Sequence, residues 1–249
     1  GDVTGEAFVL NAMANAELGE DPNGAERKWE QALKLTDRPG HYAGHALLLL
    51  YYANFQQSLG NSRAALEKYG LVLEKAHAEG ASFLEAMCRY NIGTLQWDLG
   101  NYPLAMDHYM AALKLNEIVG FQDGICATEN NIGCLYREMG DLEQALHHFQ
   151  RSYEIALRFN IPDRIIAGLN DIGLCDLKAG DAALALEKFS AALERCPEVK
   201  GAWGQEGYDY RLTEAYRNIG SATIALGDMT GAITAFGTSV ATADAGGLQ

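Results

Sequence analysis

The feature that most constrains this 249-residue chain is an internal repeat with a period of 40 residues. Alanines recur at this step, and an aromatic residue follows each of them four positions later. The members of the two series are Ala65, Ala105, Ala145 and Ala185, and Tyr69, Tyr109, Phe149 and Phe189. A fixed period of this length is typical of a chain in which one supersecondary unit stacks on copies of itself.

The pattern inside one repeat predicts two helices. Between Met87 and Leu99 the apolar residues follow helical spacing, and Gly100-Asn101 then supplies a turn that ends one helix and begins the next. Gly93 and Ala105 are small, so two antiparallel helices can approach closely there. We therefore predict an all-α fold: a right-handed superhelical solenoid of antiparallel helix pairs.

Six such repeats cover the chain, which we interpret as one domain, residues 1–249. Between Gly180 and Gly227 the step is longer by about seven residues, which indicates an insertion near residues 196–210. The repeats span approximately residues 5–45, 46–85, 86–125, 126–165, 166–212 and 213–249.

The charge of the chain excludes several classes of partner. The formal net charge is -14, whereas binding to nucleic acid or to an anionic membrane depends on Lys and Arg. The longest apolar run, residues 46–53, is too short to insert into a membrane. Five cysteines without close pairs, and a start unlike a signal peptide, indicate a reducing compartment, so we expect the protein to be cytoplasmic.

Nothing in the sequence indicates catalysis. The phosphate-binding GxxxxGK[ST], the nucleophile motif GxSxG and the zinc motif HExxH are all missing from it. We therefore predict no catalytic residues, no metal ligands, no cofactor and no enzymatic activity.

The order Asn-Ile-Gly-x-x-Tyr-x-x-x-Gly-Asp-x-x-x-Ala-x-x-x-Phe, in residues 131–149, resembles the tetratricopeptide repeat. The resemblance covers nearly the whole chain. The usual repeat has 34 residues, and the longer period here is similar to the repeats of Pins, of kinesin light chain and of Rap-type peptide receptors. This resemblance implies recognition of a protein or peptide segment.

The resemblance also implies where a partner binds, because the first helix of each tetratricopeptide pair lines the concave face. Carried over position by position, it predicts a peptide-binding face made of Asn54, Gln57, Tyr90, Asn91, Trp97, Asn130, Asn131, Arg137, Asn170, Arg217 and Asn218.

Asparagines are the most distinctive members of this predicted face. An amide both donates and accepts, so a series of them can pair with the backbone of an extended peptide. Alternatively, each Asn bonds to its own or a neighbouring helix. Tyr90 and Trp97 are either apolar anchors for the partner or packing residues between repeats.

Two further regions are candidates for contacts. The insertion carries Trp203 and Tyr208 and is predicted to be a loop, which either contacts a partner or folds back on the repeats. The last predicted helix, residues 230–243, is not followed by a polar capping helix. Its bare side indicates either a piece of a longer protein or a homo-oligomer in which it packs against another copy.

Two functions are consistent with these features. The first is a scaffold or adaptor that captures an extended peptide or partner segment on the concave face. The alternative is a ligand- or peptide-responsive sensor domain of a larger bacterial signalling protein.

Overall fold

The computed structural model describes residues 3–17, 20–37 and 42–247, except for the side chains of residues 3, 4, 42, 43, 202 and 203. These residues form helices and turns only, as the sequence predicted. The chain divides into two compact units, residues 1–121 and 122–249.

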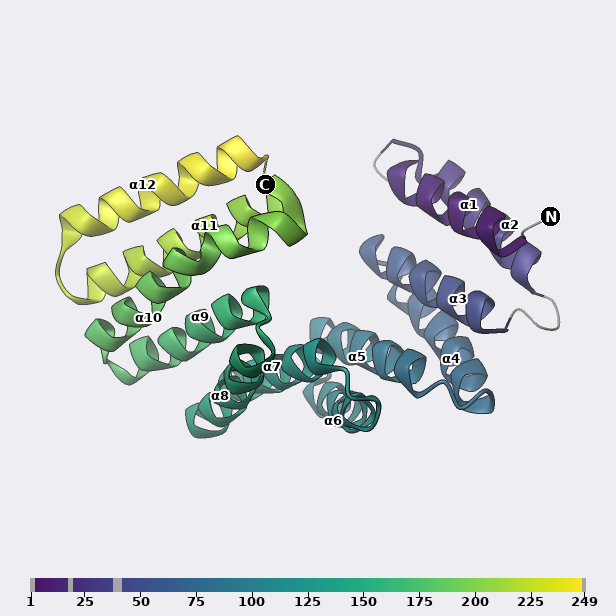
Figure 1. Cartoon of the computed structure of the whole chain (residues 1–249), viewed down its shortest axis with the longest axis horizontal. Helices are drawn as coiled ribbons and strands as arrows, with labels where there is room; N and C mark the ends of the chain where they lie inside the picture. Colours follow the sequence, from purple (N-terminus) through teal and green to yellow (C-terminus); the bar gives the residue numbers. More distant parts are fainter. Residues whose placement is uncertain (1–2, 18–19, 38–41, 248–249) are drawn as a thin grey trace. The chain divides into compact units, whose positions relative to one another are not determined.

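Unit 1 contains three helix pairs, each of which packs as an antiparallel hairpin (Figure 1). The helices are α1 (Val3–Glu17), α2 (Pro22–Thr36), α3 (Tyr42–Ser58), α4 (Ser62–Ala78), α5 (Ser82–Asp98) and α6 (Tyr102–Val119).

Unit 2 repeats the same arrangement with one addition, a 3-10 helix between its second and third pairs (Figure 1). Its elements are α7 (Gln122–Glu138), α8 (Leu142–Phe159), α9 (Pro162–Ala179), α10 (Ala182–Arg195), the 3-10 helix Cys196–Val199, α11 (Lys200–Ala225) and α12 (Met229–Gly246). The predicted all-helical repeat of paired helices is therefore confirmed.

The repeated small and aromatic residues hold each pair together. Ala105 and Tyr109 of α6 are completely buried, and a methyl group on Gly93 of α5 would lie 2.7 Å from the Tyr109 ring. The same relation joins Gly133 to Phe149 in unit 2, also at 2.7 Å. Because glycine has no side chain, the aromatic ring can pack directly against the facing helix. This explains why a glycine recurs at this position of the repeat.

Two of the second helices, α6 and α8, have 18 residues each. α6 continues to Val119 and α8 to Phe159, and both end in a residue with left-handed backbone, Gly120 and Asn160. Asn is one of the few residues that adopts this conformation without a large penalty.

The insertion differs from its prediction as a loop. After the 3-10 helix, α11 is helical from Lys200 and is interrupted only at Gly204, where φ is 69° and ψ is -164°. Buried Val199 anchors the segment, and Gln205 donates a 2.8 Å hydrogen bond to Asp209 one turn later. These local contacts favour helix over the loop that the glycine content suggested.

Candidate functional site

The first-helix face of unit 1, formed by α3 and α5, carries a connected set of polar side chains. Asn54 of α3 accepts hydrogen bonds from the Tyr69 hydroxyl at 2.7 Å and from the Asn91 amide of α5 at 2.8 Å. The Tyr69 hydroxyl also lies 2.8 Å from Gln57. Three of the predicted binding residues therefore bond within the protein, as the alternative interpretation of the asparagines held.

The two aromatic residues predicted on α5 are both half-buried. The Tyr90 ring packs against Tyr109, with ring centroids 5.8 Å apart. Thr94, one turn along, lies 3.1 Å from the Tyr109 hydroxyl. Tyr90 thus takes part in packing within its helix pair, while the half-exposed Trp97 presents part of its indole to solvent.

The first-helix face of unit 2, formed by α7, α9 and α11, is organised around Asp171. Its carboxylate accepts a 2.7 Å hydrogen bond from the Asn130 amide and a 2.7 Å ion-paired bond from Arg137. Asp171 was missed as a site residue, although it stands at the repeat position of Asn91 and Asn218. Its carboxylate gives α7 a charged anchor on α9.

Arg137 is held on further sides. Its guanidinium lies 3.4 Å from the Cys134 sulfur and 5.4 Å from the centre of the Phe149 ring. Burial raises the pKa of the Cys134 thiol to about 12, so this sulfur stays protonated at neutral pH. Arg137 is therefore engaged by its own unit and not free to meet a partner's carboxylate.

Asn170 and Asn218 behave differently from the other asparagines. Asn170 is 2% exposed and Asn218 is 4% exposed. Neither atom of the Asn170 amide has a hydrogen-bond partner among the described residues, nor does the Asn218 nitrogen. A buried amide without a partner is costly, by about 1–3 kcal/mol, so these groups hold unused hydrogen-bonding capacity.

Two predicted residues complete the face. Asn131 of α7 is half-buried, and Arg217 of α11 is exposed. Lys178 at the end of α9 is also exposed. Within the described ranges, neither Arg217 nor Lys178 takes part in an ion pair, which sets them apart from Arg137.

The other predicted contact region lies on α11. Tyr208 is half-buried, and the Lys200 ammonium lies 5.3 Å from the centre of its ring. The Trp203 side chain is outside the described residues. Tyr208 is thus partly covered by a residue of its own segment.

Two ion pairs that were not predicted from the sequence connect successive repeats of unit 2. Arg164 bonds to Asp123 at 2.7 Å, and Arg211 lies 2.6 Å from Asp163. The two Asp residues are separated by 40 positions and the two Arg by 47, which are the repeat steps of the sequence. The spacing of these residues was therefore visible in the sequence, but it indicates ion pairs only once the pairing of the helices is known.

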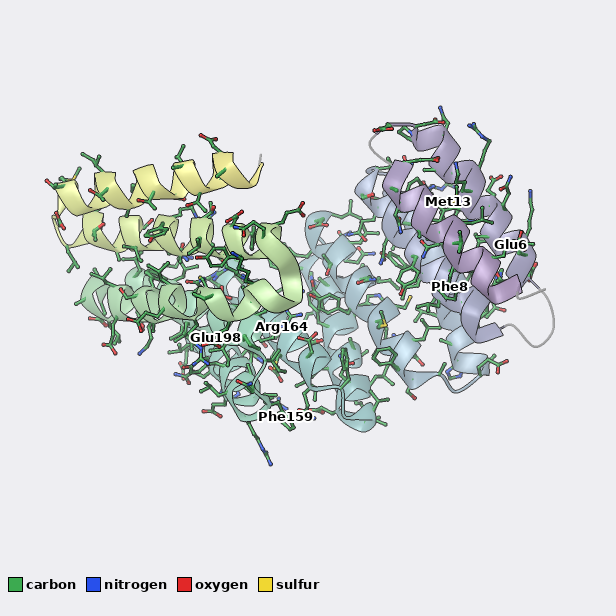
Figure 2. The ribbon with its side chains drawn as sticks, turned by 45° about the horizontal axis from the view of Figure 1, so that its top comes forward. Glu6, Phe8, Met13, Phe159, Arg164 and Glu198 are labelled. Carbon is green, nitrogen blue, oxygen red and sulfur yellow. The ribbon has the colours of Figure 1, made fainter. Side chains whose placement is uncertain are left out.

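These ion pairs border a cavity of about 320 Å³ in unit 2. Ile161, Pro162 and Val199 provide its apolar walls (Arg164 and Glu198, which approach it, are labelled in Figure 2). Its acidic residues are already paired with cations: Asp123 and Asp163 as above, and Glu198 with Arg195 at 3.1 Å. We therefore interpret this cavity as part of the packing between repeats and not as a ligand site.

Unit 2 also contains a completely buried carboxylate. Glu129 of α7 is 0% exposed and lies 2.7 Å from both the His148 ring nitrogen and the Arg151 guanidinium of α8. The His148 ring in turn stacks on Tyr136, at a centroid distance of 5.3 Å. This cluster ties the two helices of the pair together through charge.

Both terminal helices expose apolar side chains. On α12, Ile233 is 72% exposed and Val240 is 60% exposed. On α1, Val9 and Met13 are exposed (Met13 is labelled in Figure 2).

Two searches of the described residues gave negative results. No helix there is long and apolar enough to cross a membrane. In the same residues no group of three or more His, Cys, Asp or Glu side chains is placed to hold a metal ion.

The architecture defines the class: a helical-hairpin repeat protein with polar first-helix faces. Tetratricopeptide-repeat family models match residues 88–118 and 124–198. The chain therefore contains tetratricopeptide repeats, and domains of this kind generally mediate protein interactions. No curated protein matches it in sequence.

Solved structures resemble the chain in fold. BtubC (BKLC) from P. vanneervenii is 17% identical with a TM-score of 0.70, over 98% of this chain and 92% of that one. Aspartyl phosphate phosphatase F from Bacillus subtilis is 17% identical with a TM-score of 0.68, over 96% of this chain but only 60% of the other. A Rap protein complexed with Competence and Sporulation Factor is 17% identical with a TM-score of 0.65, over 98% and 67% of the two chains.

Proposed function

We propose that the chain is a protein- or peptide-binding module that receives an extended segment on its first-helix faces. The observation that carries this proposal is the pair of buried amides next to exposed Arg217: both atoms of the Asn170 amide and the Asn218 nitrogen have no hydrogen-bond partner in the described part of the chain. Extended peptides offer one N–H and one C=O per residue, and side-chain amides satisfy both.

The proposal places the strongest contacts on unit 2. In unit 1 the amides of Asn54 and Asn91 already bond to each other, so a ligand gains little by replacing that bond. In unit 2 a peptide backbone that draws Asn170 and Asn218 toward the surface supplies bonds that these side chains otherwise lack. Arg217 and Lys178 then offer charges for acidic groups of the ligand. In this view the protein acts as a cytoplasmic scaffold or adaptor.

The test compares matched pairs of substitutions in an affinity capture from lysate of the source cells. Asn170→Ala with Asn218→Ala is expected to lose a partner that the wild type retains, and Asn54→Ala with Asn91→Ala to retain most of it. Glu187→Ala with Gln150→Ala, on exposed positions of second helices, controls for non-specific loss. Circular dichroism establishes that each variant is folded.

A partner identified in this way is then reduced to synthetic peptides, whose affinity is measured by fluorescence anisotropy. Equal affinity for the wild type and for the Asn170/Asn218 variant would overturn the placement on unit 2. It would move recognition to unit 1 or to the second helices.

A second candidate is a ligand-responsive sensor, which one observation favours. The bonds Asn91–Asn54 and Asn130–Asp171 each join the first helices of successive repeats within a unit. A ligand that competes for these amides changes how neighbouring repeats are held, so its binding energy can shift repeat geometry. Hydrogen exchange of α3, α5, α7 and α9 with and without ligand tests this; unchanged exchange would favour a passive adaptor.

Self-association is a further proposal, because Ile233 and Val240 present an apolar stripe on α12. Analytical ultracentrifugation of the wild type beside Ile233→Glu tests it. A monomer in both samples would contradict self-association and would indicate that the stripe binds a different partner.

A further inference from the structure

The turn between the two helices of a repeat has the same backbone geometry in five repeats. In each, the residue after the turn glycine donates its N–H to a carbonyl five positions earlier. The bonds are Asn61 to Gln56 at 2.9 Å, Asn101 to Gln96 at 2.8 Å, Asp141 to Tyr136 at 2.9 Å, Asp181 to Asp176 at 2.9 Å and Asp228 to Thr223 at 3.0 Å. The two residues joined by this bond therefore occupy equivalent backbone positions in each turn.

In unit 1 a side-chain hydrogen bond adds to this backbone bond. The Asn101 amide donates to the Gln96 side-chain oxygen at 2.8 Å, and Asn61 donates to Gln56 at 2.9 Å. Because their side chains are used in this way, neither asparagine caps the helix that follows it. An amide pair thus closes the turn.

Asp181 in unit 2 resembles Asn61 and Asn101 of unit 1, and differs from Asp141 and Asp228 of its own unit, in not capping the helix that follows it. Asp141 and Asp228 cap their helices by accepting backbone N–H groups, at 3.1 and 2.9 Å. Asp181 begins α10 without such a cap, as Asn61 and Asn101 do in their helices. Its side chain is therefore not committed to its own helix.

The residue that corresponds to Gln96 in this turn is Asp176. Its Oδ2 atom is buried and has no hydrogen-bond partner among the described residues. Two ionised carboxylates both accept and neither donates, so this pair can close the turn only if one of them carries a proton.

We propose that Asp176 and Asp181 form a proton-dependent latch on the α9–α10 turn. The Asp176 carboxyl, protonated at Oδ2, donates to the Asp181 carboxylate and replaces the amide bond of the unit 1 turns. Loss of the proton leaves two like charges and opens the latch, which makes this turn the least restrained of the five at higher pH.

The surroundings of Asp176 both raise and lower the pKa of its carboxyl group. Burial raises the pKa of Asp176, the Asp181 carboxylate raises it further, and Lys188 of α10 lowers it. Of the described residues in elements that pack on α9, these are the charged groups that act on Asp176, and Lys188 does not approach within ion-pair distance. Because the folded-state pKa is raised, the latch stabilises the hairpin fully below the unfolded-state pKa and is lost as pH rises through the folded-state value.

The experiment measures hydrogen exchange in the full chain as a function of pH. The Ala185 N–H bonds to the Asp181 carbonyl at 3.0 Å, and the Ala105 N–H makes the same bond to Asn101 at 3.0 Å. The ratio of their protection factors cancels the intrinsic pH dependence of exchange. In the wild type this ratio is expected to fall as pH rises, by up to about tenfold for each unit by which the pKa of Asp176 is raised.

Three variants test the assignment. Asp176→Gln with Asp181→Asn rebuilds the pair found at Gln96 and Asn101, and its protection ratio is expected not to change with pH. Lys188→Met is expected to move the fall in the wild-type ratio to higher pH. Asp176→Asn alone, which supplies a permanent donor, is expected to remove most of the pH dependence.

A second measurement does not depend on any variant. Carboxyl-carbon NMR of the wild type is expected to show Asp176 titrating above the ordinary range of an aspartate. A protection ratio that is flat in the wild type, or an Asp176 that titrates at or below the ordinary range, would overturn the latch.

Discussion

The two units have the same backbone repeat but connect their repeats through different chemistry. In unit 1 the Asn54–Asn91 bond between first helices joins two neutral groups, and the carboxylates that link repeats there, Glu26 and Asp98, accept from uncharged donors. In unit 2 the corresponding links are charged: Arg137 to Asp171, Arg164 to Asp123 and Arg211 to Asp163. A repeat architecture therefore fixes where neighbouring helices touch but leaves open how they are bonded.

This difference has a physical consequence. The stability that a neutral hydrogen bond contributes changes little with pH or salt. Removing one partner of a buried ion pair, in contrast, leaves an uncompensated charge and is strongly destabilising. The apolar packing within helix pairs is common to both units.

The largest expected effect comes from the shared packing. Phe149→Ala and Tyr109→Ala each remove a completely buried ring, and each is expected to cost about 3–5 kcal/mol of unfolding free energy. Urea unfolding, followed by residue-resolved hydrogen exchange, locates the loss in the unit that carries the substitution. A large loss in one unit and a small loss in the other would show that the two units are not packed by the same device.

The next effect concerns the charged links. Arg211→Met leaves Asp163, which is 6% exposed, and Glu214 without their cation, and is expected to cost about 3 kcal/mol. Its control is Arg63→Met in unit 1, where Arg63 makes an exposed pair with Glu67 and no measurable change is expected. Thermal unfolding of both variants checks this contrast, which equal losses would contradict.

A smaller effect is expected at the contact glycines. Gly133→Ala places a methyl group 2.7 Å from the Phe149 ring and is expected to cost about 1–3 kcal/mol through overpacking. Gly93→Ala meets Tyr109 at the same distance and is expected to match it. The control is Gly237→Ala, an exposed helical position where nothing lies within 4 Å of the added methyl. Urea midpoints compare the three, and a loss at Gly237 similar to the others would refute the contact explanation.

The smallest effect tests the neutral links of unit 1. Tyr69→Phe removes the hydroxyl that bonds to Asn54 and Gln57, and is expected to cost about 1 kcal/mol. Because the lost bonds join neutral groups, the loss is expected to be the same at low and high salt. A strong salt dependence of this loss in urea unfolding would mean that unit 1 is not held by neutral bonds.

The sequence by itself determined the architecture. Gly93, Ala105 and Tyr109 recur at a step of 40 because helix pairs can approach closely only where one partner is small and the other fills the gap. Periodic steric requirements of this kind are visible in one dimension. The helix positions and the long second helices followed from them, except at residues 200–210, where glycine content outweighed local helix-stabilising contacts in the prediction.

Only the tertiary structure decided what the polar residues do. Asn91 and Asn218 stand at the same repeat position in the sequence, but Asn91 bonds to Asn54, whereas the buried Asn218 nitrogen has no hydrogen-bond partner among the described residues. An amide can satisfy its hydrogen bonds with a side chain many residues away, and which one it meets depends on how neighbouring helices pack. For the same reason Asp171 and Arg211 became recognisable only once the helices carrying their partners were in place.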